Sequence, residues 1–283
     1  MMKIWKLLVV SFLVFSCDTS GVKTSEKETS RKNNKQTVVN TLDKEHKVIA
    51  SKKLEKTFDG VTINWFEKGK GDKIVAGDLV AIDFKLKLKD GTVVDGNHFL
   101  KKDFFPFLVG YRMQTDLWDY ALQQMSIGDF VEIKIPAKLA RGDKGLGTHI
   151  PANADNYLVL RAIKKITPNR VVDGTKVWLI EADEQEKVKF NEGKTVVFHT
   201  MASSTSGGMF ANTFRSNTPF EFTLGDQGIV PGLRKALINA KTSDRMYVLV
   251  TPEDAYGNKG YMDFVKPGES VFYNLMVLDV LEK

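Results

Sequence analysis

The chain has 283 residues, a formal net charge of +6 at pH 7, a hydrophobic share of 42% and a single cysteine. This length and hydrophobic share suffice for one or two domains with buried cores and exclude a wholly disordered chain. One cysteine excludes an internal disulfide framework, and the scattered histidines give no metal-ligand spacing, so we expect no metal and no cofactor. Lysine and arginine are spread among nearly as many acidic residues, which argues against nucleic acid as a partner.

The N-terminal residues have the pattern of an export signal. Lys3 and Lys6 precede an apolar run from Leu7 to Phe15, which is too short to span a bilayer. The segment Val14-Phe15-Ser16-Cys17 then resembles the lipobox of bacterial lipoproteins. The resemblance implies a signal peptide over residues 1–17, cut before Cys17, and a lipid anchor on that cysteine. The alternative is ordinary secretion, with Cys17 in a discarded signal.

Residues 18–57 are rich in Ser, Thr, Lys, Glu and Asn and contain few apolar side chains. Such a segment cannot bury enough surface to offset the entropy lost on ordering, so we predict a disordered, flexible tether. Its charges are interpreted as those of a solvated linker. Attraction to an anionic membrane surface is the alternative.

The rest of the chain contains two copies of one module of about 110 residues. Three pairs of segments match at a nearly constant offset: 59–66 with 173–180, 77–80 with 193–196, and 105–110 with 220–225. Trp65 and Trp178 are interpreted as structural residues at equivalent positions of the two copies. We therefore predict tandem domains, domain 1 over residues 58–167 and domain 2 over residues 168–283.

Within each copy the hydrophobic pattern predicts several strands and one helix. The segment from Leu79 to Leu88 alternates apolar and polar residues, as a strand with one solvated face does, and Asp90-Gly91 then predicts a hairpin turn. Further strands are expected at 130–135, 157–163, 246–250 and 270–280, and helices from Leu117 and from Pro231. Such strands can bury their apolar face by wrapping around a helix. We predict an α+β fold in which each domain is a curved antiparallel sheet around one helix.

The segments 220–225, 229–233 and 252–257 of domain 2 and the segments 90–95 and 150–152 of domain 1 carry short motifs, and these motifs resemble those of the FKBP-type prolyl isomerase family. In domain 2, residues 252–257 (Pro-Glu-Asp-Ala-Tyr-Gly) are similar to the family's Pro-Glu-x-Ala-Tyr-Gly segment, and residues 220–225 and 229–233 resemble its run from Phe-x-Phe-x-Leu-Gly into the helix. Domain 1 carries Asp90-Gly91, Val94-Asp95, Trp118 and Ile150-Pro151-Ala152. The resemblance runs from about Asp59 to the end of the chain and implies two tandem FKBP-like domains.

Prolyl isomerisation requires little more than an apolar pocket that excludes water. Rotation about the X-Pro bond is opposed by amide resonance, with a barrier of about 18–20 kcal/mol. An apolar, aromatic pocket disfavours the polar planar amide relative to the twisted one, which lowers this barrier without a nucleophile, base or metal.

In domain 2 the resemblance implies the better pocket. Its catalytic residues would be Tyr256, Phe210 and Phe220. Tyr256 would donate a hydrogen bond from its hydroxyl to the peptide carbonyl, and the two phenylalanines would form walls of the pocket. Its further substrate-binding residues would be Ile229, Val230, Leu233, Val265, Tyr273 and His199. Three residues depart from the family pattern: Leu233 stands where a tryptophan is usual, Ala211 where an aspartate is, and His199, or a neighbour of it, where a tyrosine is.

In domain 1 the implied pocket is degenerate in a different way. It retains Phe84, Asp95, Phe105, Trp118, Ile150 and Leu158. However, Arg141 replaces the carbonyl-binding tyrosine, Val94 replaces a phenylalanine, and Gln114-Thr115 replace an apolar pair. Polar side chains at the mouth weaken the exclusion of water.

The sequence thus indicates an exported, lipid-anchored peptidyl-prolyl cis-trans isomerase that acts on X-Pro bonds of exported polypeptides. Its expected location is the cell envelope, in the periplasm or at the outer membrane. The mixed losses in both pockets leave open a non-catalytic FKBP-fold peptide-binding or chaperone lipoprotein. A purely architectural lipoprotein is the third possibility.

Overall fold

The structure is a computed structural model that describes residues 46–54, 58–182 and 187–282. All of these residues fall in one compact unit of the chain. The predicted signal peptide, Cys17 and the first part of the predicted tether lie outside the described residues. Among the residues that are described, no helix is long and apolar enough to cross a membrane.

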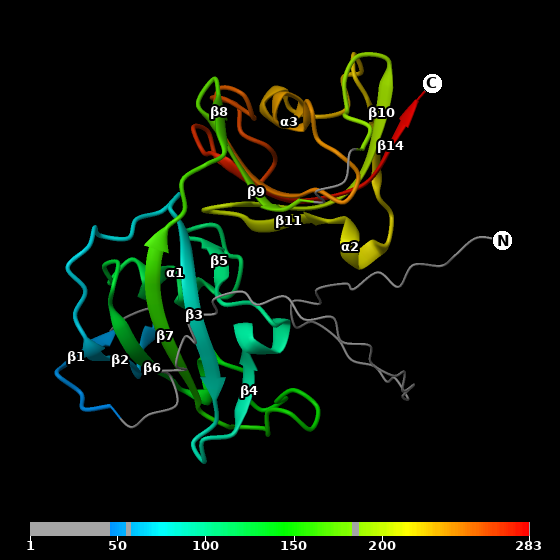
Figure 1. Ribbon diagram of the computed structural model, residues 1–283. Coiled ribbons are helices and arrows are strands. Elements are labelled where there is room, and N and C mark those ends of the chain that lie inside the picture. Colours follow the sequence, from blue (N-terminus) through cyan, green and yellow to red (C-terminus); the bar gives the residue numbers. More distant parts are fainter. Residues whose placement is uncertain (1–45, 55–57, 183–186, 283) are drawn as a thin grey trace, which may run out of the picture. The chain divides into compact units, whose positions relative to one another are not determined.

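Domain 1 is built on one antiparallel sheet (Figure 1). Its strands lie in the order β1 (Ala50–Leu54), β2 (Val61–Glu67), β6 (Phe130–Ile135), β7 (Asn156–Lys165), β3 (Leu79–Lys87) and β4 (Val93–Gly96), and β5 (Phe105–Leu108) pairs with β3. The sheet is accompanied by helix α1 (Asp116–Leu122) and by two single-turn helices, η3 (Asn97–Leu100) and η4 (Ala137–Leu139).

Domain 2 repeats this topology strand for strand. The order is β11 (Gly208–Asn212), β10 (Lys194–Ser204), β14 (Val271–Glu282), β13 (Arg245–Val250), β9 (Thr175–Glu181) and β8 (Arg170–Val172), and β12 (Phe220–Thr223) pairs with β10. Its helices are α3 (Pro231–Leu237) and a short α2 (Thr213–Ser216), which the sequence analysis did not expect. Followed in the opposite direction, from β8 to β11, this order is the same as the order of domain 1 from β1 to β4. The identical order confirms the predicted pair of tandem domains, each an antiparallel sheet with few helices.

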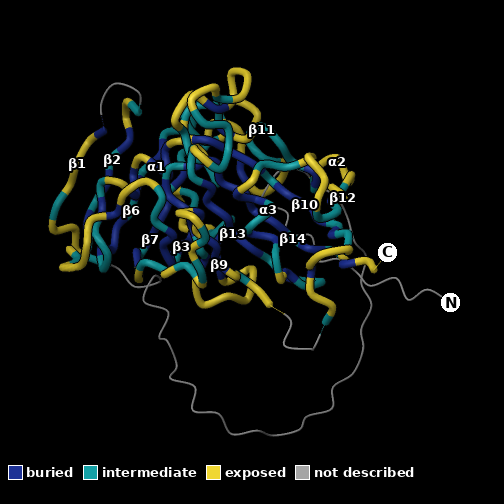
Figure 2. Tube along the Cα trace, turned by 90° about the horizontal axis from the view of Figure 1, so that it is seen from above, coloured by how far each residue is buried: buried dark blue, intermediate teal, exposed yellow. Residues whose placement is uncertain are grey.

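Helix α3 packs on the core face of the domain 2 sheet. Its buried residues Leu233, Ala236 and Leu237 join the apolar side chains of β10, β13 and β14 in one cluster. Figure 1 shows α3 beside the sheet, and Figure 2 shows buried stretches along these three strands. Pro231 lies in the first turn of the helix, where its missing N–H has no intrahelical partner to lose. Gly232 follows because a Cβ there would lie 2.3 Å from Val250 Cγ1.

The N-terminal boundary of domain 1 differs from the predicted one. Strand β1 lies within the segment predicted to be a tether, and it pairs antiparallel with β2 along its whole length. Leu54 is 3% exposed, whereas the preceding three residues are exposed. The tether prediction is therefore wrong for residues 50–54. A lysine-rich strand with one solvated face resembles a linker in composition.

The two tryptophans assigned to equivalent positions lie on different faces of their sheets. Trp65 shares the buried face of β2 with Val61 and Ile63. Trp178 follows the core residue Val177 along β9 and belongs instead to a second apolar cluster. The interpretation of the two as equivalents is wrong by one residue, because side chains along a strand alternate between its faces.

Candidate functional site

Four aromatic rings in domain 2 form a continuous cluster. Tyr256 and Tyr261 are stacked, with ring centroids 4.8 Å apart and an interplanar angle of 19°. Phe210 on β11 lies 6.0 Å from Tyr261 and 5.8 Å from Phe264, again measured between ring centroids. Phe210 and Tyr256 are half-buried, and Tyr261 and Phe264 are about 40% and 39% exposed. The cluster therefore presents aromatic surface to solvent.

An apolar floor lies beneath this cluster. Leu233, Val265 and Tyr273 are buried in the domain 2 core, and the half-buried Ile229 and Val230, in the loop entering α3, pack against the same core. Phe210 and Tyr256 pack against it as well. The structure thus brings together seven of the residues predicted for the domain 2 pocket.

Tyr256 contributes a hydroxyl group to this apolar surface. Burial raises the pKa of Tyr256, and a side-chain hydrogen bond with Tyr273 opposes that rise. Burial raises the pKa of Tyr273 well above its ordinary value, and the same hydrogen bond raises it further. Each tyrosine hydroxyl can donate or accept a hydrogen bond, so Tyr256 also offers a hydroxyl to a bound carbonyl.

The other two predicted residues of domain 2 lie differently. Phe220 is 46% exposed at the start of β12, with its ring 5.9 Å from that of the core residue Phe198. His199 faces away from the core: it is 5% exposed, hydrogen-bonds Thr213 Oγ1 through Nδ1 at 3.1 Å and contacts Phe214, with the ring centroids 5.0 Å apart. Burial lowers the pKa of His199. Its neighbour Phe198 holds the core-facing position.

Tyr261 and Phe264 were not predicted for the site. They lie between Tyr256 and Val265, both of which were predicted, in a loop closed by the paired residues Tyr261 and Val265. The sequence could have indicated them, because two aromatic residues lie between two predicted pocket residues. The polar and charged residues of the same segment, Asn258, Lys259 and Asp263, make this pattern hard to recognise.

The six residues predicted for the domain 1 pocket form a more closed arrangement. Trp118 packs edge-on against Phe84, with centroids 5.2 Å apart, and stacks on the core residue Phe107 at 5.8 Å. Phe84, Phe105, Trp118, Ile150 and Leu158 are each less than 10% exposed. The aromatic rings of domain 1 therefore contact one another more than they contact solvent.

Asp95 is the half-buried member of this set. Burial raises its pKa, while the N–H of Gly96 and the charges of His98 and Arg141 oppose the rise. Arg141 itself is exposed. A carboxylate close to the charge of Arg141 makes this part of domain 1 polar.

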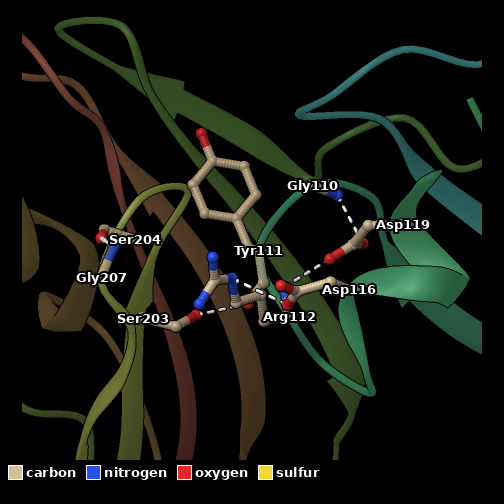
Figure 3. Close-up of polar contacts among 8 residues, drawn as sticks. All are labelled: Gly110, Tyr111, Arg112, Asp116, Asp119, Ser203, Ser204 and Gly207. Atoms are coloured by element: carbon tan, nitrogen blue, oxygen red, sulfur yellow. Dashed lines mark hydrogen bonds and ion pairs between the residues drawn. The ribbon is translucent and has the colours of Figure 1, made fainter. Parts of the chain in front are cut away.

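The loop that precedes α1 is held by two aspartates (Figure 3). Asp119 accepts hydrogen bonds from the N–H of Gly110 at 2.6 Å and of Arg112 at 2.7 Å, and Asp116 pairs with the Arg112 guanidinium at 3.0 Å. Arg112 has a left-handed backbone, with φ of 53°. Asp119 therefore fixes a strained turn between β5 and α1.

Asp119 is expected to make stability depend on pH. Burial raises its pKa from 3.8 to about 6, so between these values the folded state binds more protons than the unfolded state. The free energy of unfolding then falls as pH rises through this window, by on the order of 2 kcal/mol from this group. Urea unfolding at a series of pH values should show that Asp119→Asn removes this fall. The exposed Asp103→Asn is the control, and equal slopes for wild type and Asp119→Asn would contradict the assignment.

The comparisons with known proteins show the family of the chain. The family model of FKBP-type peptidyl-prolyl cis-trans isomerases matches residues 70–159 and 186–278. Similar curated proteins include peptidyl-prolyl cis-trans isomerase FKBP9 of Rattus norvegicus, 24% identical over 207 residues (73% of this chain and 35% of that protein). FKBP10 of Homo sapiens is 26% identical over 185 residues, which are 65% of this chain and 31% of that protein. FK506-binding protein 2 of Debaryomyces hansenii is 38% identical over 87 residues, which are 31% of this chain and 63% of that protein.

Among solved structures, the three FKBP domains of wheat FKBP73 match with a TM-score of 0.40 and 22% identity, over 79% of this chain and 96% of that one. FkpA from Escherichia coli matches with a TM-score of 0.34 and 26% identity, over 39% of this chain and 50% of that one. The chain spans about a third of the length of the FKBP9 and FKBP10 relatives. Because the family model covers most of both domains, the chain belongs to the FKBP-type peptidyl-prolyl cis-trans isomerase family.

Proposed function

We propose that domain 2 catalyses cis-trans isomerisation of X-Pro bonds in polypeptides. The observation that carries the proposal is the partly exposed aromatic cluster over an apolar floor, to which Tyr256 contributes a hydroxyl group. A prolyl ring held there leaves water, and a carbonyl that accepts from Tyr256 is fixed while the amide twists. Each tenfold gain in rate needs about 1.4 kcal/mol, so desolvation and one hydrogen bond supply a useful acceleration.

Domain 1 is proposed to contribute less to catalysis. Its pocket rings are mutually packed, and Asp95 and Arg141 make its mouth polar. Binding of peptide without any rate gain by the chain would instead favour the non-catalytic binding or chaperone function.

Tyr256→Phe should lower kcat/KM for a proline-containing tetrapeptide by about three- to tenfold, because one hydrogen bond contributes about 0.5–1.5 kcal/mol. The measurement is a cis-trans isomerisation assay on the full chain. Tyr261→Phe is the matched control, since it keeps the stacked ring and removes a hydroxyl that is given no role. Equal losses in the two variants, or no acceleration by the wild type, would contradict the proposal.

We further propose that the chain is exported and anchored to the cell envelope through Cys17, in the periplasm or at the outer membrane, where its substrates are exported polypeptides. The support is the basic start, the apolar run and the lipobox-like segment before that cysteine. Labelling with a radioactive fatty acid in a bacterial host tests this proposal. The label should appear on the wild type and be absent from Cys17→Ser, and its persistence in that variant would contradict the anchor.

A further inference from the structure

The outer face of the domain 2 sheet is apolar because domain 1 covers it. Trp178, Tyr247, Leu249 and Phe272 are each less than 10% exposed and form one cluster with residues of domain 1. The strands of domain 1 carry polar residues at the corresponding positions: Asn64 pairs with Glu132 as Trp178 pairs with Tyr247. The domain 2 face is thus adapted to contact domain 1.

Tyr111 is one of the domain 1 residues in this contact. It is 6% exposed, belongs to the same apolar cluster, and its ring lies 6.2 Å from that of Phe272. Its backbone carbonyl accepts a hydrogen bond of 2.7 Å from Ser203 Oγ (Figure 3). Its hydroxyl has a side-chain hydrogen bond with Ser270, and burial raises its pKa. Tyr111 therefore contacts domain 2 through its backbone, its ring and its hydroxyl.

Both hydrogen-bond partners of Tyr111 adjoin segments that carry the aromatic cluster. Ser203 lies at the end of β10, next to the hairpin into β11 and Phe210, and Ser270 follows the loop that carries Tyr261 and Phe264. We name these two segments the hairpin (residues 204–210) and the late loop (residues 261–269).

The hairpin and the late loop are bonded to each other. Ser204 Oγ donates to the carbonyl of Phe264 and accepts from the N–H of Gly207 at 2.9 Å. Ser206 Oγ donates to Glu269 at 2.6 Å. A Cβ on Gly207 would lie 2.0 Å from the Phe264 carbonyl oxygen, so the two backbones are in close approach. A constraint on one segment is therefore transmitted to the other.

The turn that carries Tyr111 is itself rigid. Asp119 holds the N–H groups on either side of Tyr111, and the Arg112 side chain packs so close to Gly208 in the hairpin that a Cβ there would lie 3.0 Å from its guanidinium. This same turn leads into Gln114 and Thr115, which precede α1 and were assigned to the mouth of the domain 1 pocket.

We infer that Tyr111 of domain 1 is a positioning residue for the prolyl pocket of domain 2, because it fixes the hairpin and the late loop that hold the walls of that pocket. The inference rests on the proposed function of domain 2. It makes the two domains one functional unit in which domain 1 sets how tightly domain 2 holds a prolyl peptide, without contacting that peptide.

The test measures amide hydrogen exchange in the full chain for wild type, Tyr111→Phe and Tyr111→Ala. Exchange in the hairpin and the late loop should be at least threefold faster in Tyr111→Ala and faster to a smaller extent in Tyr111→Phe, which keeps the ring. The KM for a prolyl tetrapeptide should rise at least threefold in Tyr111→Ala while kcat stays within twofold. Tyr157→Ala, a domain 1 tyrosine on β7, is the matched control and should leave both segments unchanged.

The outcomes separate this inference from the proposed function. Unchanged exchange in both segments of a folded Tyr111→Ala protein overturns the inference, whatever the activity. If Tyr111→Ala does not fold, Tyr111→Phe decides, and exchange equal to wild type overturns the inference. Faster exchange in a chain whose wild type shows no isomerase activity supports the positioning role, with peptide Kd in place of KM, and contradicts only the proposed function.

Discussion

Trp178→Ala should lower the free energy of unfolding by about 3–5 kcal/mol, the usual cost of removing a large buried aromatic side chain. Trp178 is 2% exposed in the cluster between the domains, and its indole N–H donates to the Ile166 carbonyl at 2.8 Å. The variant loses apolar contact on the domain 2 face, and the Ile166 carbonyl loses the hydrogen bond from the indole N–H. Urea unfolding followed by circular dichroism measures the loss.

The same experiment tests whether the domains unfold together. With the contact intact, we expect one cooperative transition, and with Trp178 removed, two transitions of unequal midpoint. Asn64→Ala, the corresponding position on β2 of domain 1, is the matched control and should cost less than about 1 kcal/mol. A loss of that small size in Trp178→Ala would show that the apolar cluster contributes little to stability.

The fold could be predicted because the sequence contains two copies of the same module. The pattern of each copy alone predicts only short strands and one short helix. Three pairs of segments that match at a nearly constant offset define the domain length and show that the two copies share one topology. The contact between the domains was missed although the repeat contains its signal. Tyr247 and Leu249 stand where domain 1 has Glu132 and Lys134, and apolar residues that replace polar ones on a solvated face indicate a covered face.

The candidate site could be predicted where a motif fixes the position of a residue along the chain. Tyr256 and Phe210 belong to one ring cluster, and the two residues before α3 pack against the same core. The assignment of His199 was sensitive to a single residue, because the pairing of β10 with β14 shifts register between Val197 and Phe198. A shift of one residue exchanges the two faces of a strand, and no composition pattern reports it.

Phe210→Ala should lower kcat/KM for X-Pro isomerisation at least tenfold. Phe210 is the ring that connects β11 to the late loop, through contacts with Tyr261 and Phe264. Burying a phenylalanine side chain contributes about 1.5–3 kcal/mol, and loss of about 1.4 kcal/mol of transition-state stabilisation already lowers the rate tenfold. Removing the ring also admits water to the pocket, which favours the planar amide over the twisted one.

The matched control for this prediction is Phe214→Ala. Phe214 is half-buried, lies only four residues further along the chain and contacts the ring of His199, on the face of the sheet away from the aromatic cluster. Both variants delete one aromatic ring from the same region, so a general loss of stability would affect them similarly. A tenfold loss in Phe210→Ala with less than a twofold loss in Phe214→Ala would locate the chemistry in the ring cluster. Equal losses in two folded variants would instead mean that the prolyl group is held elsewhere, because only Phe210 contacts the rings around Tyr256.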